Sequence, residues 1–146
     1  MENNSAVYSL GTSTRAKAEF TRLLRSHGIE VVIDVRRFPT SRIEHFKQQA
    51  LAQLLAEAQI DYLHLGENLG GYRNGGYQAF TATSEFMQGI DVVERTALKN
   101  RVAILCAERL PWRCHRRFIT SELEKRGWQI RHIIDEQQTW ISSKPG

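Results

Sequence analysis

Apolar residues along the chain form short runs that alternate with amphipathic segments. The runs at residues 6–10, 29–35, 60–65, 102–106 and 129–134 predict strands. The run at 29–35 is rich in β-branched residues and shows no alternation, which is typical of a strand buried on both faces. Apolar residues at helical spacing predict helices over about 14–27, 46–58, 84–99 and 112–126, with Gly28 and Gly127 as C-terminal stops.

The regular order of strands and helices indicates the fold class. It predicts an α/β, Rossmann-like domain of three layers, with a mostly parallel sheet of about five strands and helices on both faces. We expect residues 1–5 to form an N-terminal tail, residues 6–136 a single α/β domain, and residues 137–146 a C-terminal tail that frays from residue 140.

Polar residues gather where the predicted strands end. Open parallel sheets bind ligands outside the carboxyl ends of their strands, so these residues are expected at one edge. In chain order they are Thr12, Ser13, Asp34, Arg36, Arg37, Cys106, Glu108, Asp135 and Glu136, together with Glu67, Tyr72, Arg73 and Tyr77 in a glycine-rich loop over 66–77.

Composition narrows the class of protein and the partners. The 146 residues are 41% hydrophobic and 25% charged, as in globular proteins. A formal charge of +4 favours anionic partners, a nucleotide or nucleic acid among them. No apolar run has the length of a membrane span, and residues 1–4 lack a signal pattern, so no membrane association is expected. Two cysteines do not make a disulfide scaffold, which points to a reducing cytoplasm.

The segment from Cys106 to Arg117 carries the clearest candidate chemistry. A thiol at a strand end, facing cations and a helix N-terminus, is a candidate nucleophile. We expect Cys106 or Glu108 to react, with His115 as the proton carrier. Cys114, inside the first turn of the predicted helix, is expected to pack and to be the less reactive thiol. The alternative is that Cys106 is only a small core residue.

Arg113, Arg116 and Arg117 lie in the first turn of the helix predicted over 112–126. Their positive charges oppose the helix dipole, whose positive end is there, so we expect an anion, or the carboxylate of Glu108 or Asp34, at that end. The predicted anion-binding residues are Arg36, Arg113, Arg116, Thr12 and Ser13. Asp34, Cys114, Arg73, Tyr72 and Tyr77 are predicted to support the site. For one arginine of the pair Arg36-Arg37, a structural ion pair with Asp34 or Glu108 is the alternative.

The glycine-rich loop lacks the Gly-Lys-Ser/Thr of a phosphate-binding loop. Its tyrosines suit either a lid that stacks on a base or an ordinary surface loop. No cofactor is predicted. A metal held by Cys106, Glu108, Cys114 and His115 is a weaker alternative, because adjacent Cys and His are unusual spacing for structural zinc.

Several of these segments together resemble the bacterial domain of unknown function 488. They are residues 8–14, Asp34-Val35-Arg36, Phe46, Leu69-Gly70-Gly71, Leu105-Cys106-Ala107-Glu108 and Cys114-His115-Arg116. The resemblance covers residues 6–136 and implies an α/β fold. It marks Asp34, Arg36, Cys106, Glu108, Cys114, His115 and Arg116 as signature positions, and it implies no reaction. Segment 31–36 and the loop after Cys106 also resemble rhodaneses, although Pro111 lacks an N–H and the loop is not glycine-rich.

These observations predict a cytoplasmic enzyme that acts on an anionic, phosphorylated or nucleotide-like small molecule at the carboxyl edge of the sheet. The alternative is a non-catalytic nucleotide or nucleic-acid binding module. In a third interpretation the thiols and arginines are scaffolding for an interaction protein. The sequence leaves the oligomeric state open.

Overall fold

The computed structural model describes residues 6–142, which are built on a six-stranded sheet of order β3-β2-β4-β1-β5-β6. The strands are β1 (Ala6–Gly11), β2 (Val31–Asp34), β3 (Asp61–His64), β4 (Val102–Cys106), β5 (Gln129–Ile133) and β6 (Thr139–Ser142). The first five are parallel, and β6 pairs antiparallel with β5. The predicted α/β class with a mostly parallel sheet is confirmed.

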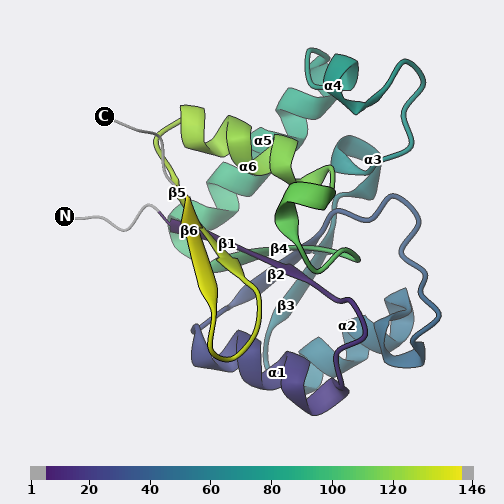
Figure 1. The fold of residues 1–146 in the computed structure, drawn as a ribbon, viewed down its shortest axis with the longest axis vertical. Coiled ribbons are helices and arrows are strands. Elements are labelled where there is room, and N and C mark those ends of the chain that lie inside the picture. The colour runs from purple at the N-terminus through teal and green to yellow at the C-terminus, as the bar shows by residue number, and fades with distance from the viewer. Residues whose placement is uncertain (1–5, 143–146) are drawn as a thin grey trace.

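Helices cover both faces of this sheet (Figure 1). On one face lie α1 (Lys17–Ser26) and α2 (Gln48–Glu57), and on the other lie α5 (Ser84–Lys99) and α6 (Arg116–Lys125). The short elements are α3 (Gly66–Leu69), α4 (Tyr77–Phe80) and two 3-10 turns, η1 (Glu44–Phe46) and η2 (Pro111–Arg113). None of the helices in the described part of the chain is long and apolar enough to cross a membrane.

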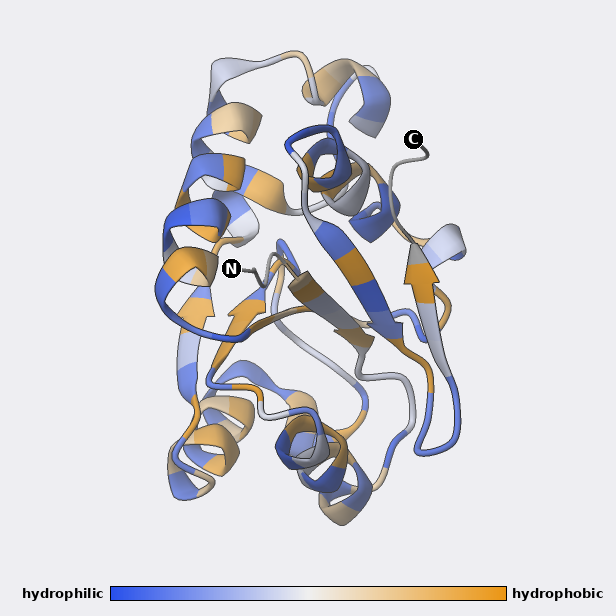
Figure 2. Ribbon diagram, turned by 90° about the vertical axis from the view of Figure 1, so that its left-hand side faces the viewer, coloured by the Kyte–Doolittle hydropathy of each residue, from blue (hydrophilic) through white to orange (hydrophobic). Residues whose placement is uncertain are grey.

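Alternation along the strands divides the core into two layers. On β4, Val102, Ile104 and Cys106 pack on the side of α5 and α6, whereas Ala103 and Leu105 pack on the side of α1 and α2. Figure 2 shows apolar residues running through the strands between the two layers of helices. The alternation therefore directs the Cys106 side chain toward α6, and so toward the segment that carries Cys114.

The C-terminal segment differs from the predicted tail. Residues 139–142 form β6, in register from Ile133 opposite Thr139 to Ile130 opposite Ser142. A tight turn allows this pairing, because the Ile134 N–H donates to the Gln138 carbonyl at 3.0 Å. Trp140 then stacks on His132 with ring centroids 5.1 Å apart. The predicted N-terminal tail, residues 1–5, and residues 143–146 lie outside the described part of the chain.

The direction of the connections determines where a cleft forms. The connection after β2 runs through α2 on one face, and the connection after β4 runs through α6 on the other. Neighbouring strands whose connections leave to opposite faces open a crevice at their carboxyl ends. β2 and β4 are such neighbours. The fold therefore places a crevice between the loop after Asp34 and the loop after Cys106.

Candidate active site

A cleft of about 610 Å³ lies at this position. Three segments line it: the loop after β2, the glycine-rich loop, and the chain between β4 and α6. Of the predicted site residues, the cleft brings together Arg36, Tyr72, Tyr77, Cys106, Glu108, Arg113, Cys114 and His115. Thr12, Ser13, Asp34, Arg73 and Arg116 are not among its lining residues. The expectation that polar residues gather at the carboxyl ends of the strands thus led to residues that line this cleft. It also included residues that do not line the cleft and instead contact the segments that do.

Two free thiols meet in the cleft. The Sγ atoms of Cys106 and Cys114 are 2.9 Å apart. Cys106 ends β4 and is 1% exposed, whereas Cys114 is partly exposed. Cys114 differs from its predicted place inside a helix, because it adopts extended backbone angles between η2 and α6. From there its Sγ accepts the N–H of Arg116 at 3.4 Å, as a capping side chain accepts a free N–H at a helix start.

His115 holds the second contact to the Cys114 sulfur. Its Nδ1 lies 3.6 Å from that Sγ, and its Nε2 lies 3.2 Å from the carbonyl oxygen of Val35. A carbonyl oxygen only accepts hydrogen bonds, so Nε2 carries a hydrogen and Nδ1 is the atom that exchanges a proton with the thiol. The loop after β2 therefore fixes the tautomer of an imidazole that follows β4.

The surroundings separate the acidities of the two thiols. The pKa of Cys114 is lowered well below its ordinary value, first by the hydrogen bond from the Cys106 thiol and then by His115 and the Arg116 N–H. Burial raises the pKa of Cys106, and the neighbouring Cys114 sulfur adds to this effect. These directions favour Cys114 as the thiolate and Cys106 as its hydrogen-bond donor, the reverse of the sequence-based expectation. Which thiol reacts remains a prediction.

Arg36 lies in the cleft wall as one half of a buried ion pair. Its Nε and one terminal nitrogen donate to the two oxygens of Asp34 at 2.9 and 2.8 Å, and its other terminal nitrogen donates to the Phe46 carbonyl at 2.7 Å. Tyr62 donates to the same carboxylate at 2.7 Å. Arg36 therefore forms the structural ion pair with Asp34 that was considered as the alternative to anion binding, because its charge and its N–H groups already have partners.

Arg116 is fully buried behind the cleft. One terminal nitrogen donates to Ser9 Oγ at 3.1 Å, and the other donates to the Glu108 carbonyl at 2.8 Å. Its Nε has no hydrogen-bond partner among the described residues. The positive charge of Arg116 lowers the pKa of Cys106, against the larger effect of burial. The predicted anion clamp would need Arg116 at the cleft surface, and the structure places it beneath Cys106 instead.

Two other guanidiniums do face the cleft. Arg113 is exposed, and Arg37, which was predicted at this edge but not as an anion-binding residue, lines the opposite wall. Neither forms a salt bridge with any residue in 6–142; Arg37 donates instead to the Tyr72 carbonyl at 2.6 Å. The signal for Arg37 was its place directly after Arg36 at the strand end. With Arg36 neutralised by Asp34, Arg37 and Arg113 are the cations left to attract an anion.

The turn after β1 supports the site from outside the cleft. The N–H groups of Thr12 and Ser13 donate to the carbonyls of Cys106 and Ala107 at 2.8 and 2.9 Å. Gly11 allows this contact, because a Cβ on it would lie 1.9 Å from the Glu108 carbonyl oxygen. Thr12 and Ser13, predicted to bind an anion, thus serve here to brace the loop that carries Cys106 and Glu108.

The glycine-rich loop closes the third side. Tyr72 is 85% exposed and packs beside Phe38, with ring centroids 6.1 Å apart. Tyr77 is half-buried; its hydroxyl donates to Leu69, and its ring lies 5.1 Å from the His115 ring. Arg73 donates to the Gly70 carbonyl at 2.8 Å and lies over the Phe80 ring, so it holds the loop's own shape. Tyr72 and Phe38 form an aromatic rim at the mouth of the cleft.

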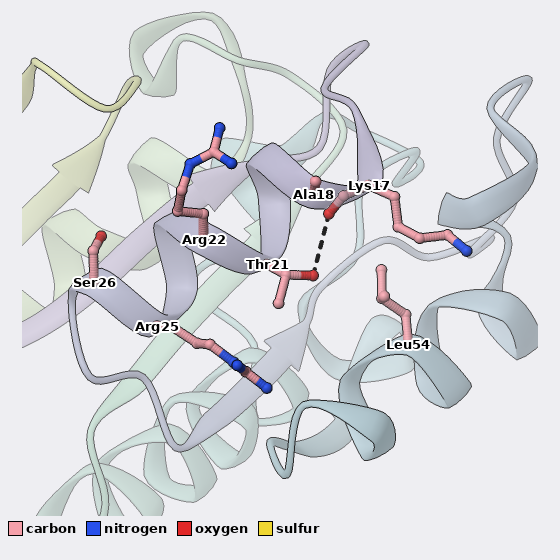
Figure 3. Close-up of a pocket in the computed structure, with 7 residues that line it drawn as sticks. All are labelled: Lys17, Ala18, Thr21, Arg22, Arg25, Ser26 and Leu54. Atoms are coloured by element: carbon pink, nitrogen blue, oxygen red, sulfur yellow. Dashed lines mark hydrogen bonds between the residues drawn. The ribbon is translucent and has the colours of Figure 1, made fainter.

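A second, larger hollow of about 790 Å³ lies between α1 and Leu54 of α2 (Figure 3). Lys17, Arg22 and Arg25 line it, and the Thr21 hydroxyl donates to the Lys17 carbonyl at 3.1 Å. Arg22 pairs with Glu136. No thiol, imidazole or carboxylate lines this hollow. Its volume exceeds that of the cleft, but its hydroxyls and its amine have no imidazole or carboxylate beside them in the lining to act as a base.

Comparisons with known proteins agree with part of the sequence analysis. The family model described as "Domain of unknown function DUF488" matches residues 16–123. Searches of curated proteins and of solved structures find no match, so the likeness to rhodaneses has no counterpart there. Among residues 6–142 no group of three or more His, Cys, Asp or Glu side chains is arranged to hold a metal ion. Since the matched region spans well over half of the chain, this protein belongs to the DUF488 family.

Proposed function

We propose that the protein is an enzyme in which the Cys114 thiolate attacks an anionic small molecule bound in the cleft. One observation carries the proposal: the Cys114 sulfur lies in the cleft wall with three groups around it that stabilise a thiolate. They are the Cys106 thiol at 2.9 Å, the Arg116 N–H at 3.4 Å and His115 Nδ1 at 3.6 Å. A thiolate held in this way and open to solvent is the usual form of a nucleophilic cysteine.

His115 supplies the proton transfer that such an attack requires. With Nε2 held by the Val35 carbonyl, Nδ1 takes the Cys114 proton and returns it to the leaving group. This pairing of thiol and imidazole needs no cofactor. Two thiols and an imidazole are also zinc ligand types, but no three such side chains among residues 6–142 are arranged to hold a metal ion, so the geometry does not favour the metal alternative.

The charge around the cleft favours an anionic substrate. Arg37 and Arg113 face it from opposite walls without carboxylate partners among residues 6–142, and the chain as a whole carries +4. The aromatic rim of Phe38 and Tyr72 adds a flat apolar surface beside these cations. A small molecule with an anionic group and a planar ring, such as a nucleotide, suits this combination. Free thiols require a reducing compartment, which favours the cytoplasm.

The test compares two alkylating agents of similar size, anionic iodoacetate and neutral iodoacetamide. We expect the folded protein to be modified at Cys114 and not at Cys106, as peptide mass spectrometry would show, with Cys114→Ser unreactive. Arg113→Ala should lower the ratio of the iodoacetate rate to the iodoacetamide rate by about two- to five-fold, the effect of one exposed charge. Arg25→Ala, at the hollow between α1 and α2, should leave that ratio unchanged.

Modification of Cys106 before Cys114, or of neither until the protein unfolds, would remove the thiol enzyme from consideration. The aromatic rim then favours the second candidate, a non-catalytic nucleotide or nucleic-acid binding module in which Phe38 and Tyr72 stack on a base. Strongly salt-dependent binding of an oligonucleotide, weakened by Tyr72→Ser, would identify that function.

A further inference from the structure

Cys106 places a second sulfur beside Cys114, where a hydrogen-bond donor to the Cys114 thiolate would be enough for simple nucleophilic attack. It is 1% exposed, yet its Sγ is 2.9 Å from the Sγ of Cys114. The other contact of its sulfur is the Glu108 carbonyl oxygen at 3.7 Å. A buried serine there could donate the same hydrogen bond to the Cys114 thiolate, so that role alone does not require sulfur. A second thiol within reach of the first suggests a use for sulfur at both positions.

We propose that Cys106 is a resolving thiol, and that the cleft takes a small anionic molecule with a sulfur–sulfur bond, which the Cys114–Cys106 pair reduces. This inference rests on the proposed role of Cys114 as the nucleophile and names its substrate class. It follows from which atoms each sulfur can reach.

Access separates the two thiols into two steps. Cys114 is partly exposed in the cleft and can meet a substrate. Cys106 also lies in the cleft wall, but only 1% of its surface is exposed, so a substrate cannot reach its sulfur. The group that Cys106 can attack is therefore one that Cys114 has already bound. A disulfide needs a sulfur separation of about 2.05 Å, so the two sulfurs must approach by about 0.9 Å from the 2.9 Å of the dithiol. Such proximity makes the second step effectively intramolecular.

The two steps balance as thiol–disulfide exchange. The Cys114 thiolate attacks one sulfur of the substrate R–S–S–R, a Cys114–S–S–R bond forms, and the first RS⁻ leaves with the proton from His115 Nδ1. Cys106 then attacks the Cys114 sulfur, the Cys106–Cys114 disulfide forms, and the second RS⁻ leaves with the proton that Cys106 gives up. The substrate is reduced to two thiols and the cysteine pair is oxidised. An external dithiol reductant returns the pair to its reduced form and is itself oxidised to a disulfide.

Arg116 suits the second step. Before the reaction, the Cys114 thiolate accepts the hydrogen bond from Cys106 and keeps that thiol protonated. Once Cys114 is bound to the substrate it is neutral, and this restraint is gone. The guanidinium of Arg116, buried behind Cys106 and in contact with the Glu108 carbonyl, then favours a thiolate at Cys106. Cys106 thus donates its hydrogen to the Cys114 thiolate until Cys114 has formed a disulfide with the substrate.

The experiment uses dithiobis-nitrobenzoate, a dianionic aromatic disulfide whose released thiolate is coloured, on the full chain. We expect the wild-type protein to release two equivalents rapidly and to end as an adduct-free disulfide, lighter by two hydrogens in its intact mass. Cys106→Ser should release one equivalent and retain one nitrobenzoate group. Cys114→Ser should release none in the same time.

The charge of the substrate is tested with a second variant. Arg113→Ala should slow the first release by about tenfold with this probe, and dipyridyl disulfide, which is neutral, should show a smaller change. Arg25→Ala is the matched control.

The outcomes separate this inference from the proposed function. If the wild type releases one equivalent and keeps the adduct as Cys106→Ser does, the resolving role is wrong while Cys114 stands as the nucleophile. If Cys114→Ser reacts as fast as the wild type, both proposals are wrong. If dipyridyl disulfide and the dianionic probe respond equally to Arg113→Ala, the assignment of an anionic substrate is overturned. Circular dichroism of each variant checks that it folds.

Discussion

At the scale of single residues, the site depends on one backbone carbonyl. The oxygen of Val35 accepts the hydrogen of His115 Nε2, although the two residues come from different strand ends. Without that acceptor the imidazole could turn or take its other tautomer, and Nδ1 would no longer face the Cys114 sulfur. The adjacency of β2 and β4 in the sheet therefore supplies the acceptor that turns His115 Nδ1 toward the neighbouring Cys114 sulfur.

Replacement of His115 should raise the pKa of Cys114, because the imidazole contributes both a hydrogen bond and a positive charge that lower it. We expect His115→Gln to move the midpoint of the iodoacetamide rate against pH upward by about one pH unit. Cys106→Ala, which removes the largest of the lowering effects, should move it in the same direction. The control is Thr40→Ala, on the cleft wall after β2. An unchanged midpoint in both thiol-site variants would mean that neither contact sets the acidity of Cys114.

At the scale of elements, the loop after β4 is held by its neighbours rather than by its own sequence. β1 ends beside β4, and the turn that follows β1 donates two backbone hydrogen bonds to this loop. The α1 connection and the loop of Cys106 approach so closely that one side of the contact has to be glycine. The position of the buried thiol is thus set by packing between two backbones.

Gly11→Ala should disturb this contact, because its Cβ would lie 1.9 Å from the Glu108 carbonyl oxygen and 2.8 Å from the Arg109 Cα. Backbone atoms cannot turn aside as a flexible side chain can. We expect a loss of about 1–3 kcal/mol in the free energy of unfolding, measured with urea. Cys114 alkylation should slow as well. Gly71→Ala, where the nearest atom is His115 Nδ1 at 3.5 Å, serves as the control for stability. Equal stability of the two variants would show that the β4 loop moves freely.

At the scale of the whole molecule, the sheet and its helices follow from local patterns, and the roles of the charged residues do not. The segment 84–99 is a helix as predicted, with Thr83 capping its first turn. The helix predicted from residue 112 begins only at Arg116. Before it, the chain forms a 3-10 turn over Pro111–Arg113, and Cys114 has an extended backbone. Arg116 carries no local sign of burial, since its partners Ser9 and Glu108 are brought to it by the fold. The spacing of apolar residues predicts which face of a helix or strand is buried. It does not predict which arginine is already hydrogen-bonded within the fold and which is left to bind a ligand.

A buried histidine links the stability of the whole domain to pH. His132 is 3% exposed and hydrogen-bonds to Ser9 Oγ, and burial, together with nearby Arg116, lowers its pKa to about 3. In the unfolded chain it binds a proton below about pH 6.5. Between these values the unfolded state binds more protons, so the stabilisation is complete above pH 6.5 and is lost as the pH falls.

Between pH 6.5 and 5, the wild type should therefore lose about 2 kcal/mol more unfolding free energy than His132→Asn, which keeps a polar group without titrating. Urea unfolding at the two pH values measures this difference. His27→Asn, a change at a histidine on the edge of α1, is the control. Parallel losses in the wild type and His132→Asn would assign the acid sensitivity to other groups.

The strand order has a consequence for how the protein is made. Among the described strands β1 is made first, and it lies between β4 and β5, which follow much later in the chain. It pairs Gly11 with Cys106 and Val7 with Ile130, partners about a hundred residues away in the chain. The sheet therefore cannot close before the chain through Ile133 has been made, and β1 lacks its two neighbours until then. During that interval Cys106 has neither its buried position nor its partner, so the fold does not yet shield this thiol from oxidation.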